Sequence, residues 1–105
     1  NTGKVGHQVT VEQGYAAAHQ ATLDCLASIK AAIGDLDKVT QVVKLLVMVN
    51  ADPNFDQHSV VANGSSDLLV ELYGEQGRHA RSAVGMSGLP RGSCVEVEMV
   101  IEVAD

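Results

Sequence analysis

Aromatic residues are scarce in this sequence of 105 residues, which has no tryptophan, one phenylalanine and two tyrosines. Basic residues are also few: 7 lysines and arginines stand against 13 aspartates and glutamates, for a formal net charge of -6. A nucleic-acid binder needs positive charge to neutralise phosphates, and for single strands it needs aromatic rings on which bases stack. We therefore predict no nucleic-acid partner. The acidic balance also disfavours an anionic membrane surface.

Long apolar runs are missing as well. The most apolar stretch, Val39 to Val49, is interrupted by Gln41 and Lys44. It is far shorter than the roughly 20 residues needed to cross a bilayer. The first residues also lack the apolar segment of a signal peptide. We expect no membrane partner.

Cysteine is rare too, with Cys25 and Cys94 far apart and in no Cys-x-x-Cys or Cys/His cluster. This usage is typical of reduced core thiols in an intracellular protein, with one long-loop disulfide as the alternative. We predict a cytoplasmic protein. The four histidines show no His-x-x-x-His pair, so we predict no metal site and interpret them as surface or loop residues. The serines lie in no nucleophile-elbow signature, and we predict no catalytic triad.

What is present is a clear succession of secondary-structure patterns. Thr10 and Gln13 form a capping-box pattern that begins a helix, and Gly34 supplies its stop. A strand is predicted over Val39 to Asn50, and a second helix from about Asp56 to Tyr73. Asn63-Gly64 interrupts that second helix pattern, so a separate turn at its start remains an alternative.

The C-terminal third alternates apolar and polar residues. Arg81 to Met86 and Ser93 to Val103 read as strands, and the Gly- and Pro-containing residues 87–92 between them favour a hairpin. The order helix, strand, helix, strand, strand predicts an α+β fold, with two helices packed on one face of a mostly antiparallel sheet. One domain is expected over residues 1–105.

The predicted hairpin would bring an arginine to two glutamates. Arg81, beside small residues, would share a sheet face with Glu96 and Glu98, because facing it into valines would bury an unpaired charge. An Arg fork beside a glutamate suits a small carboxylate ligand. An ordinary structural ion pair is the alternative.

Several of these motifs together resemble the Rid/YjgF family of enamine and imine deaminases, many of which carry the label endoribonuclease. The motifs are Ala80-Arg81-Ser82-Ala83-Val84-Gly85, Leu89-Pro90, Val95-Glu96-Val97-Glu98 and the turn Gly34 to Val39. The resemblance covers most of residues 10–103, and the stretch from Asn63 to Glu71 is similar to a less-studied branch. It implies a chorismate-mutase-like, RidA-like fold assembled as a homotrimer, with sites in clefts between subunits.

The resemblance also implies an activity and roles for four residues. The expected reaction is hydrolysis of small 2-imino or enamine acids to 2-keto acids and ammonia, without metal or organic cofactor. Arg81 would hold the substrate carboxylate, Glu96 would orient the attacking water, and Asn63 would lie near the cleft. Ala83 stands where many members have a cysteine, although its backbone could still contact the ligand.

A further departure lies at the front of the chain. Family members have two strands ahead of the first helix, whereas nine residues precede Thr10, so we expect an N-terminally short domain, either a fragment or a natural variant. Two hypotheses remain open: a hydrolytic deaminase, and a non-catalytic module that binds a small carboxylate metabolite on the same trimeric scaffold. A nuclease is disfavoured by the net charge of -6 and the lack of aromatic residues.

Overall fold

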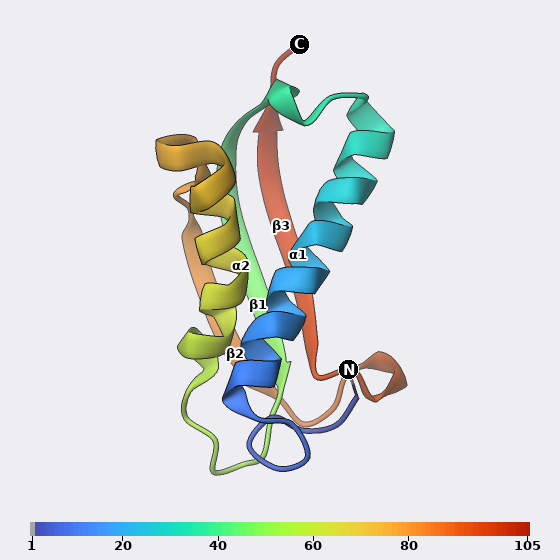
Figure 1. Cartoon of the computed structure of the whole chain (residues 1–105), viewed down its shortest axis with the longest axis vertical. Coiled ribbons are helices and arrows are strands. Elements are labelled where there is room, and N and C mark those ends of the chain that lie inside the picture. Colours follow the sequence, from blue (N-terminus) through green and yellow to red (C-terminus); the bar gives the residue numbers. More distant parts are fainter. Residues whose placement is uncertain (1) are drawn as a thin grey trace.

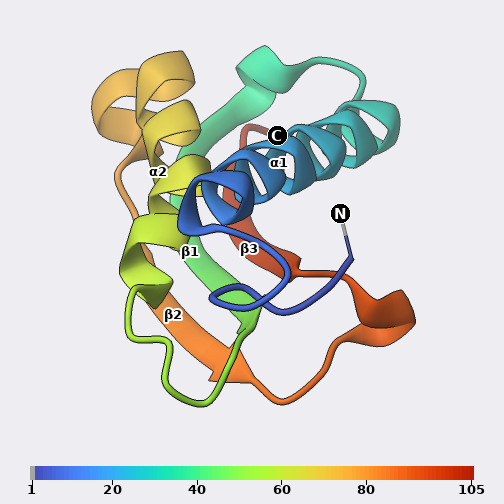
Figure 2. The same ribbon diagram turned by 60° about the horizontal axis from the view of Figure 1, so that its bottom comes forward.

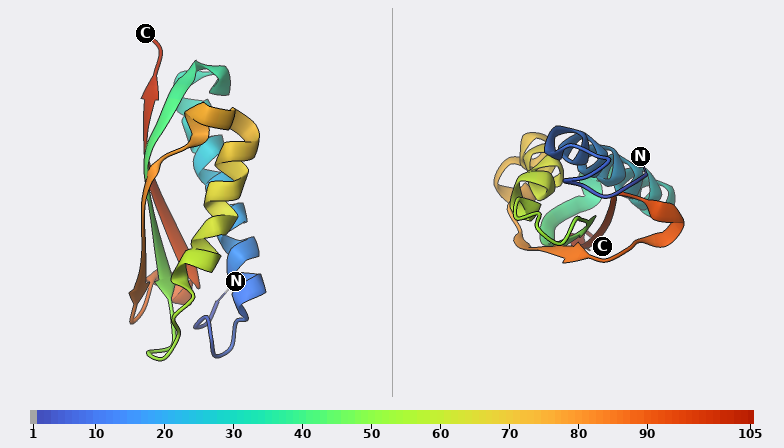
Figure 3. Two further views of the ribbon diagram at one scale, coloured as in Figure 1. Left: turned by 90° about the vertical axis from the view of Figure 1, so that its left-hand side faces the viewer. Right: turned by 90° about the horizontal axis from the view of Figure 1, so that it is seen from below.

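The computed structural model describes residues 2–105, which form two layers. Two helices lie side by side on one face of a three-stranded sheet, whose other face is uncovered (Figures 1 and 3). The elements in chain order are α1 (Val11–Ile33), β1 (Val39–Asn50), α2 (His58–Tyr73), β2 (Ala80–Met86) and β3 (Val95–Val103). Three short 3-10 helices join them: η1 (Leu36–Lys38), η2 (Gly74–Gly77) and η3 (Pro90–Gly92). The predicted α+β class with helices on one face is confirmed.

Helix α1 begins and ends where the sequence predicts. The Thr10 side chain accepts a hydrogen bond from the Gln13 backbone N–H, and the Gln13 side chain accepts one from the Thr10 N–H. This reciprocal capping box satisfies two backbone donors at the helix start. At the other end Gly34 has φ 90° and donates its N–H to the Lys30 carbonyl. A positive φ is what glycine tolerates and other residues rarely adopt.

Helix α2 is continuous through Asn63-Gly64, so the alternative of a separate turn is wrong. Gly64 lies where α2 crosses α1, and a Cβ at that position would overlap the backbone carbonyl oxygen of Tyr15. The glycine therefore allows the two helices to approach closely, which offsets its low helix propensity. The helix starts at His58, two residues after the predicted start.

The sheet has the strand order β2-β1-β3, with β1 parallel to β2 and antiparallel to β3. The predicted hairpin between the last two strands is therefore wrong, and the sheet is mixed rather than mostly antiparallel. Helix α2 connects β1 to its parallel neighbour β2, as in a βαβ unit. The chain after β2 then crosses to the far side of β1 before entering β3 (Figure 2).

The core lies between the sheet and the helices. Leu45, Val47 and Val49 of β1 are fully buried, and they meet Val61 and Leu69 of α2 in one cluster. Because side chains alternate along a strand, the intervening residues of β1 face the uncovered side. The predicted alternation of the last strand is confirmed: Val95 is buried, whereas Glu96 is exposed.

The residues before α1 pack against one end of the sheet. Val5 is fully buried and forms two backbone hydrogen bonds at the end of β1. Its N–H donates to the carbonyl oxygen of Asn50, and its carbonyl oxygen accepts from the N–H of Asp52. Thr2 forms an isolated bridge to Ser93. Within residues 2–105, no helix combines the length and apolar character needed to span a membrane.

Candidate functional site

Arg81 lies on β2, at an edge of the sheet and on the side covered by the helices. It is in register with Leu45 of β1, whose side chain is buried beneath the helices, so both side chains project from the same face. Edge position lets the long side chain of Arg81 run past the core and keep its guanidinium exposed, in contact with α2. The guanidinium is therefore accessible to solvent and needs no glutamate beside it.

Two polar side chains of α2 hold the guanidinium. Arg81 Nη1 donates to Asn63 Oδ1 at 2.7 Å and to Ser66 Oγ at 3.2 Å. Asn63 and Ser66 are three residues apart on the helix and therefore share one face. The structure thus brings together Asn63 and Arg81, two of the residues that sequence reasoning selected.

Glu96 is not part of this group within one chain, and the prediction that Arg81 and Glu96 share a sheet face is wrong. Glu96 of β3 is in register with Met48 on the uncovered face, and β1 separates it from β2. A hairpin would make β2 and β3 neighbours, whereas β1 lies between them. Among residues 2–105, the one ion pair joins Arg78 to Glu75, so no carboxylate neutralises Arg81.

Ala83 follows Arg81 on the same face of β2. It is in register with Val47 and packs, partly buried, against the hydrophobic core. Its methyl group contributes to packing beside the arginine and offers no chemistry of its own.

Two residues that the sequence analysis did not select complete the surroundings of Arg81. His79 Nε2 lies 2.8 Å from Ser66 Oγ, and His79 Nδ1 lies 2.6 Å from the Gly77 carbonyl oxygen. The available signal was the spacing: His79 and Arg81 are two apart on an extended chain, and Asn63 and Ser66 are three apart on a helix. It becomes visible only once α2 and β2 are known to pack together.

A hollow of about 230 Å³ opens between α2 and the start of β2, lined by Ser66, Val70, Arg78, His79 and Arg81. It holds two guanidinium groups, one hydroxyl and one imidazole. Arg78 is paired at 3.0 Å with Glu75, and both side chains are mostly exposed. Arg81 therefore supplies the unpaired positive charge, and the hollow is suited to a small anion.

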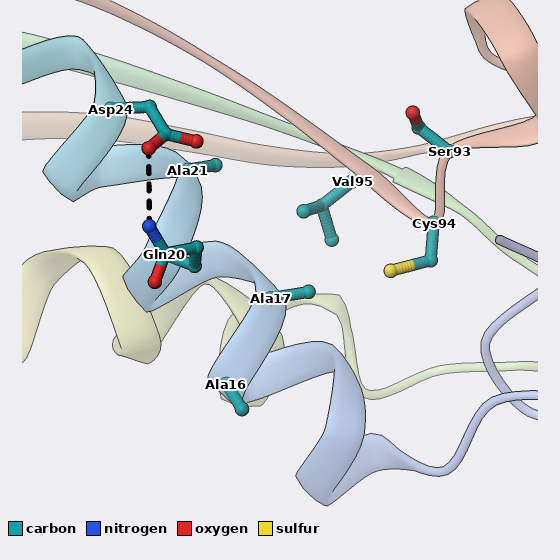
Figure 4. A pocket seen from close by; sticks show the side chains of 8 residues that line it. All are labelled: Ala16, Ala17, Gln20, Ala21, Asp24, Ser93, Cys94 and Val95. Atoms are coloured by element: carbon teal, nitrogen blue, oxygen red, sulfur yellow. Dashed lines mark hydrogen bonds between the residues drawn. The ribbon is translucent and has the colours of Figure 1, made fainter. Parts of the chain in front are cut away.

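A second hollow, of about 360 Å³, lies toward the opposite edge of the sheet, between α1 and the start of β3 (Figure 4). Small side chains of α1 form one wall, and Ser93, Cys94 and Val95 form the other. Among its polar side chains, Gln20 donates to Asp24 at 3.1 Å. Burial raises the pKa of the Cys94 thiol, which disfavours its reactive thiolate form. Both Cys94 and Cys25 are free thiols.

Comparison with known proteins identifies the family. A family model described as "YjgF/chorismate_mutase-like, putative endoribonuclease" matches residues 1–103. The chain belongs to the YjgF/chorismate mutase-like family. The resemblance on which the sequence prediction relied is confirmed by this match, as is the fold that it implied.

Three individual proteins are similar to this family member. Protein TCP17 of Trypanosoma cruzi is 50% identical over 103 residues, which are 97% of this chain and 64% of TCP17. The crystal structure of Atu1372 from Agrobacterium tumefaciens, described as having unknown function, has 42% identity and a TM-score of 0.97, covering 99% of this chain and 67% of that one. A structure from Shewanella oneidensis MR-1, described as a "putative endoribonuclease", has 35% identity and a TM-score of 0.94, covering 97% of this chain and 68% of that one.

The chain thus spans 64% of the length of the curated relative. Of the three descriptions, that of the Shewanella oneidensis structure names an activity, "putative endoribonuclease", and the other two name none.

Proposed function

We propose that this protein hydrolyses small 2-imino or enamine acids to 2-keto acids and ammonia, without a cofactor, in a cleft between subunits of a homotrimer. The observation that carries the proposal is the Arg81 guanidinium, which Asn63 and Ser66 hold at the edge of a small hollow and which no carboxylate neutralises. The chain belongs to the YjgF family, and the resemblance of its motifs to the imine deaminases of that family adds the expectation of imine chemistry.

Arg81 is the carboxylate anchor in this proposal. A guanidinium presents several N–H donors in one plane and holds a carboxylate through two parallel hydrogen bonds. Nη1 is engaged with α2, which leaves the other donors of the guanidinium for the ligand. Asn63 orients the fork through a carbonyl oxygen and so adds no charge that would compete with the substrate.

Glu96 orients the water, and it comes from the partner subunit, because β1 separates Arg81 from the Glu96 of its own chain. A site between subunits is therefore part of the proposal. Support comes from the uncovered sheet face, on which Val84, Met86 and Val100 are 40%, 38% and 52% exposed. Apolar side chains gathered on an open sheet face favour burial against another copy.

A binding module without turnover is the second candidate. It is favoured by the separation of Arg81 from Glu96 within one chain and by Ala83 standing where many deaminases have a cysteine. In that case Arg81 would still hold a small carboxylate, and no water would be activated.

The test measures ammonia and keto-acid release from freshly generated 2-iminopropanoate and 2-iminobutanoate. Wild type is compared with buffer, with Arg81→Ala and with Lys30→Ala, which removes an exposed cation from α1 as a matched control. Arg81→Ala removes one charge-assisted anchor, which contributes about 3 kcal/mol at most, so kcat/KM should fall by roughly 100-fold. Light scattering on the same samples gives the oligomeric state, with Val100→Asp as the variant expected to weaken assembly.

The outcomes separate the candidates. Acceleration that Arg81→Ala abolishes and Lys30→Ala preserves supports the deaminase. A folded trimer that is stabilised by 2-oxobutanoate but accelerates neither imine supports the binding module. Salt-sensitive RNA binding would contradict both and favour the nuclease that the family description names, a reading that the net charge of -6 opposes. We also propose a cytoplasmic location, which the two free thiols support.

A further inference from the structure

Ser66 and His79 form a hydrogen-bonded pair whose proton positions follow from their neighbours. His79 Nδ1 faces the Gly77 carbonyl oxygen at 2.6 Å, and a carbonyl oxygen can only accept. Nδ1 therefore carries the ring proton, and in the neutral imidazole Nε2 is left with a free lone pair. Ser66 Oγ lies 2.8 Å from Nε2 and donates its proton there.

The oxygen of Ser66 has a second partner. Arg81 Nη1 donates to it at 3.2 Å, so the hydroxyl accepts from a cation and donates to a base. Both contacts favour the build-up of negative charge on Oγ, because the cation stabilises that charge and the imidazole can take the proton. One lone pair of the oxygen remains for a water or a ligand in the hollow.

The pair is held by secondary structure and lies where a ligand would reach it. Ser66 comes from the middle of α2 and His79 from the residue before β2, and both are partly buried. Both also line the hollow of about 230 Å³ beside Arg81. The charged groups around the imidazole are Arg81 and Arg78, together with Glu75, which is paired with Arg78.

We propose that Ser66 and His79 are the proton-transfer pair of the Arg81 hollow, and that Ser66 is consequently a reactive hydroxyl toward an electrophile bound there. The imino-acid substrate in this scheme rests on the function proposed above. A water molecule hydrogen-bonded to Ser66 attacks the iminium carbon: a C–O bond forms and the π electrons of C=N move to nitrogen. The water's proton passes to Oγ as the Ser66 proton passes to His79 Nε2.

The second half of the reaction returns that proton. Protonated His79 gives it back through Ser66 to the nitrogen of the carbinolamine. The C–N bond then breaks with its electron pair on nitrogen, the hydroxyl oxygen forms the C=O bond, and its proton goes to ammonia. The products are a 2-keto acid and ammonium, and His79 is neutral again.

The direct test is labelling by phenylmethanesulfonyl fluoride, followed by mass spectrometry of the intact chain and its peptides. Oγ attacks sulfur, the S–F bond breaks with loss of fluoride, and His79 takes the hydroxyl proton. We expect one adduct, on Ser66, and a labelling rate at least tenfold lower in His79→Gln, whose amide keeps polarity but accepts no proton. Ser82→Ala and His19→Gln, which change a serine on the opposite sheet face and a histidine on α1, should label like wild type.

Occupancy of the hollow gives a second readout. Because 2-oxobutanoate carries the carboxylate that Arg81 would hold, it should slow labelling of Ser66 in the wild type. A purely structural Ser66–His79 hydrogen bond would produce neither labelling nor protection. Circular dichroism of each variant checks that the fold is kept.

The inference is overturned if Ser66 takes no label, if His79→Gln labels as fast as wild type, or if the keto acid gives no protection. It is also overturned if wild type hydrolyses imines and His79→Gln does so equally well. Failure of the proposed function looks different: Ser66 is labelled, depends on His79 and is protected by the keto acid, yet wild type accelerates neither imine. That result supports an activated pair acting on another electrophilic carboxylate.

Discussion

Two hollows of this domain, one on each side of β1, each lie between a helix and an edge strand, yet they differ in chemistry. The larger, about 360 Å³, lies between α1 and the start of β3 and is lined by alanines, a free thiol and an amide–carboxylate pair. The smaller, about 230 Å³, lies between α2 and β2 and gathers two arginines, a histidine and a serine. Volume is therefore a poor guide to function here. What matters is whether polar groups are left with unfilled hydrogen-bonding capacity.

The difference follows from how each strand meets its helix. β3 and the cysteine that precedes it present valines and a thiol to the small side chains of α1, so the charged residues of β3 point to the uncovered face. β2 is an edge strand with small residues around Arg81, and the arginine reaches polar side chains on α2. Mostly small side chains therefore line one hollow, whereas cationic and polar side chains line the other, which is the one suited to an anion.

The largest expected effect comes from Gly64→Val, which should disturb both hollows at once. A side chain at this position would overlap the Tyr15 carbonyl oxygen where α1 and α2 cross. Overpacking of this kind costs about 1–3 kcal/mol or more. Urea denaturation should show a loss of about 3 kcal/mol in the free energy of unfolding. Gly88→Val, at a glycine with open space around it and no positive φ, is the control. Equal stability of the two variants would contradict the close helix contact.

Asn63→Asp should affect the smaller hollow alone. Its new carboxylate would replace the Oδ1 that accepts from Arg81 at 2.7 Å and would pair with the guanidinium. The substrate carboxylate would then compete with a fixed anion, and we expect about a tenfold weaker binding of 2-oxobutanoate, or roughly 1.4 kcal/mol. Titration calorimetry measures this, with Asn54→Asp on the loop before α2 as the matched variant. Unchanged affinity would argue against Arg81 as the anchor.

Alkylation of Cys94 tests the larger hollow. Burial raises the pKa of this thiol above its ordinary value of 9.0, so the reactive thiolate is suppressed at neutral pH. Iodoacetamide at pH 7 should modify the folded chain several-fold more slowly than the urea-unfolded chain, with Cys25→Ser used to isolate Cys94. The rate should keep rising with pH as the thiolate forms and should level off only above pH 9. Rapid modification at pH 7 would show that the hollow is an open, reactive site.

Tyr73→Phe should have the smallest effect and should leave both hollows intact. The Tyr73 hydroxyl donates to the Leu36 carbonyl oxygen at 3.0 Å and ties the end of α2 to η1. Burial, with the nearby charges of Asp37 and Asp35, raises the pKa of the phenol above 10.0. Loss of the bond should cost about 1 kcal/mol.

The contribution of Tyr73 to stability depends on pH with a definite sign. Because the folded state favours the neutral phenol, this contribution to stability is fully present below pH 10.0 and is lost as pH rises through the folded pKa. Thermal unfolding between pH 9 and 11 should show a steeper decline for wild type than for Tyr73→Phe, to the extent that Tyr73 contributes. Parallel declines would place the alkaline titration elsewhere.

The elements of the fold were largely predictable from local signals. The capping residues Thr10 and Gln13, the stop at Gly34 and the alternation after Ser93 all lie within a few residues of the feature that they specify. The site was less predictable. Arg81 came from the residue pattern and then from a resemblance to a family, Asn63 came from the resemblance alone, and their contact depends on α2 lying against β2.

The errors came from strand pairing. Two strands separated by a Gly- and Pro-containing connection read as a hairpin, but β2 pairs in parallel with β1 instead. The connection through α2 makes that pairing possible, since the helix returns the chain to the same end of the sheet. Because β2 pairs with β1, Arg81 lies on the helix-covered face beside Ser66 and His79. Glu96 lies on the uncovered face.

The sequence by itself therefore determined the elements, the caps of α1 and the alternation of β3, because these depend on backbone conformation and residue spacing along a few turns or pleats. Only the tertiary structure decided which strands are neighbours, and with it which side chains meet. Strand order depends on burying the apolar faces of β1, α2 and β2 against one another, a global balance to which residues far apart in the chain contribute together. The charge of Arg81 and the hydroxyl–imidazole pair beside it are the local result of that balance.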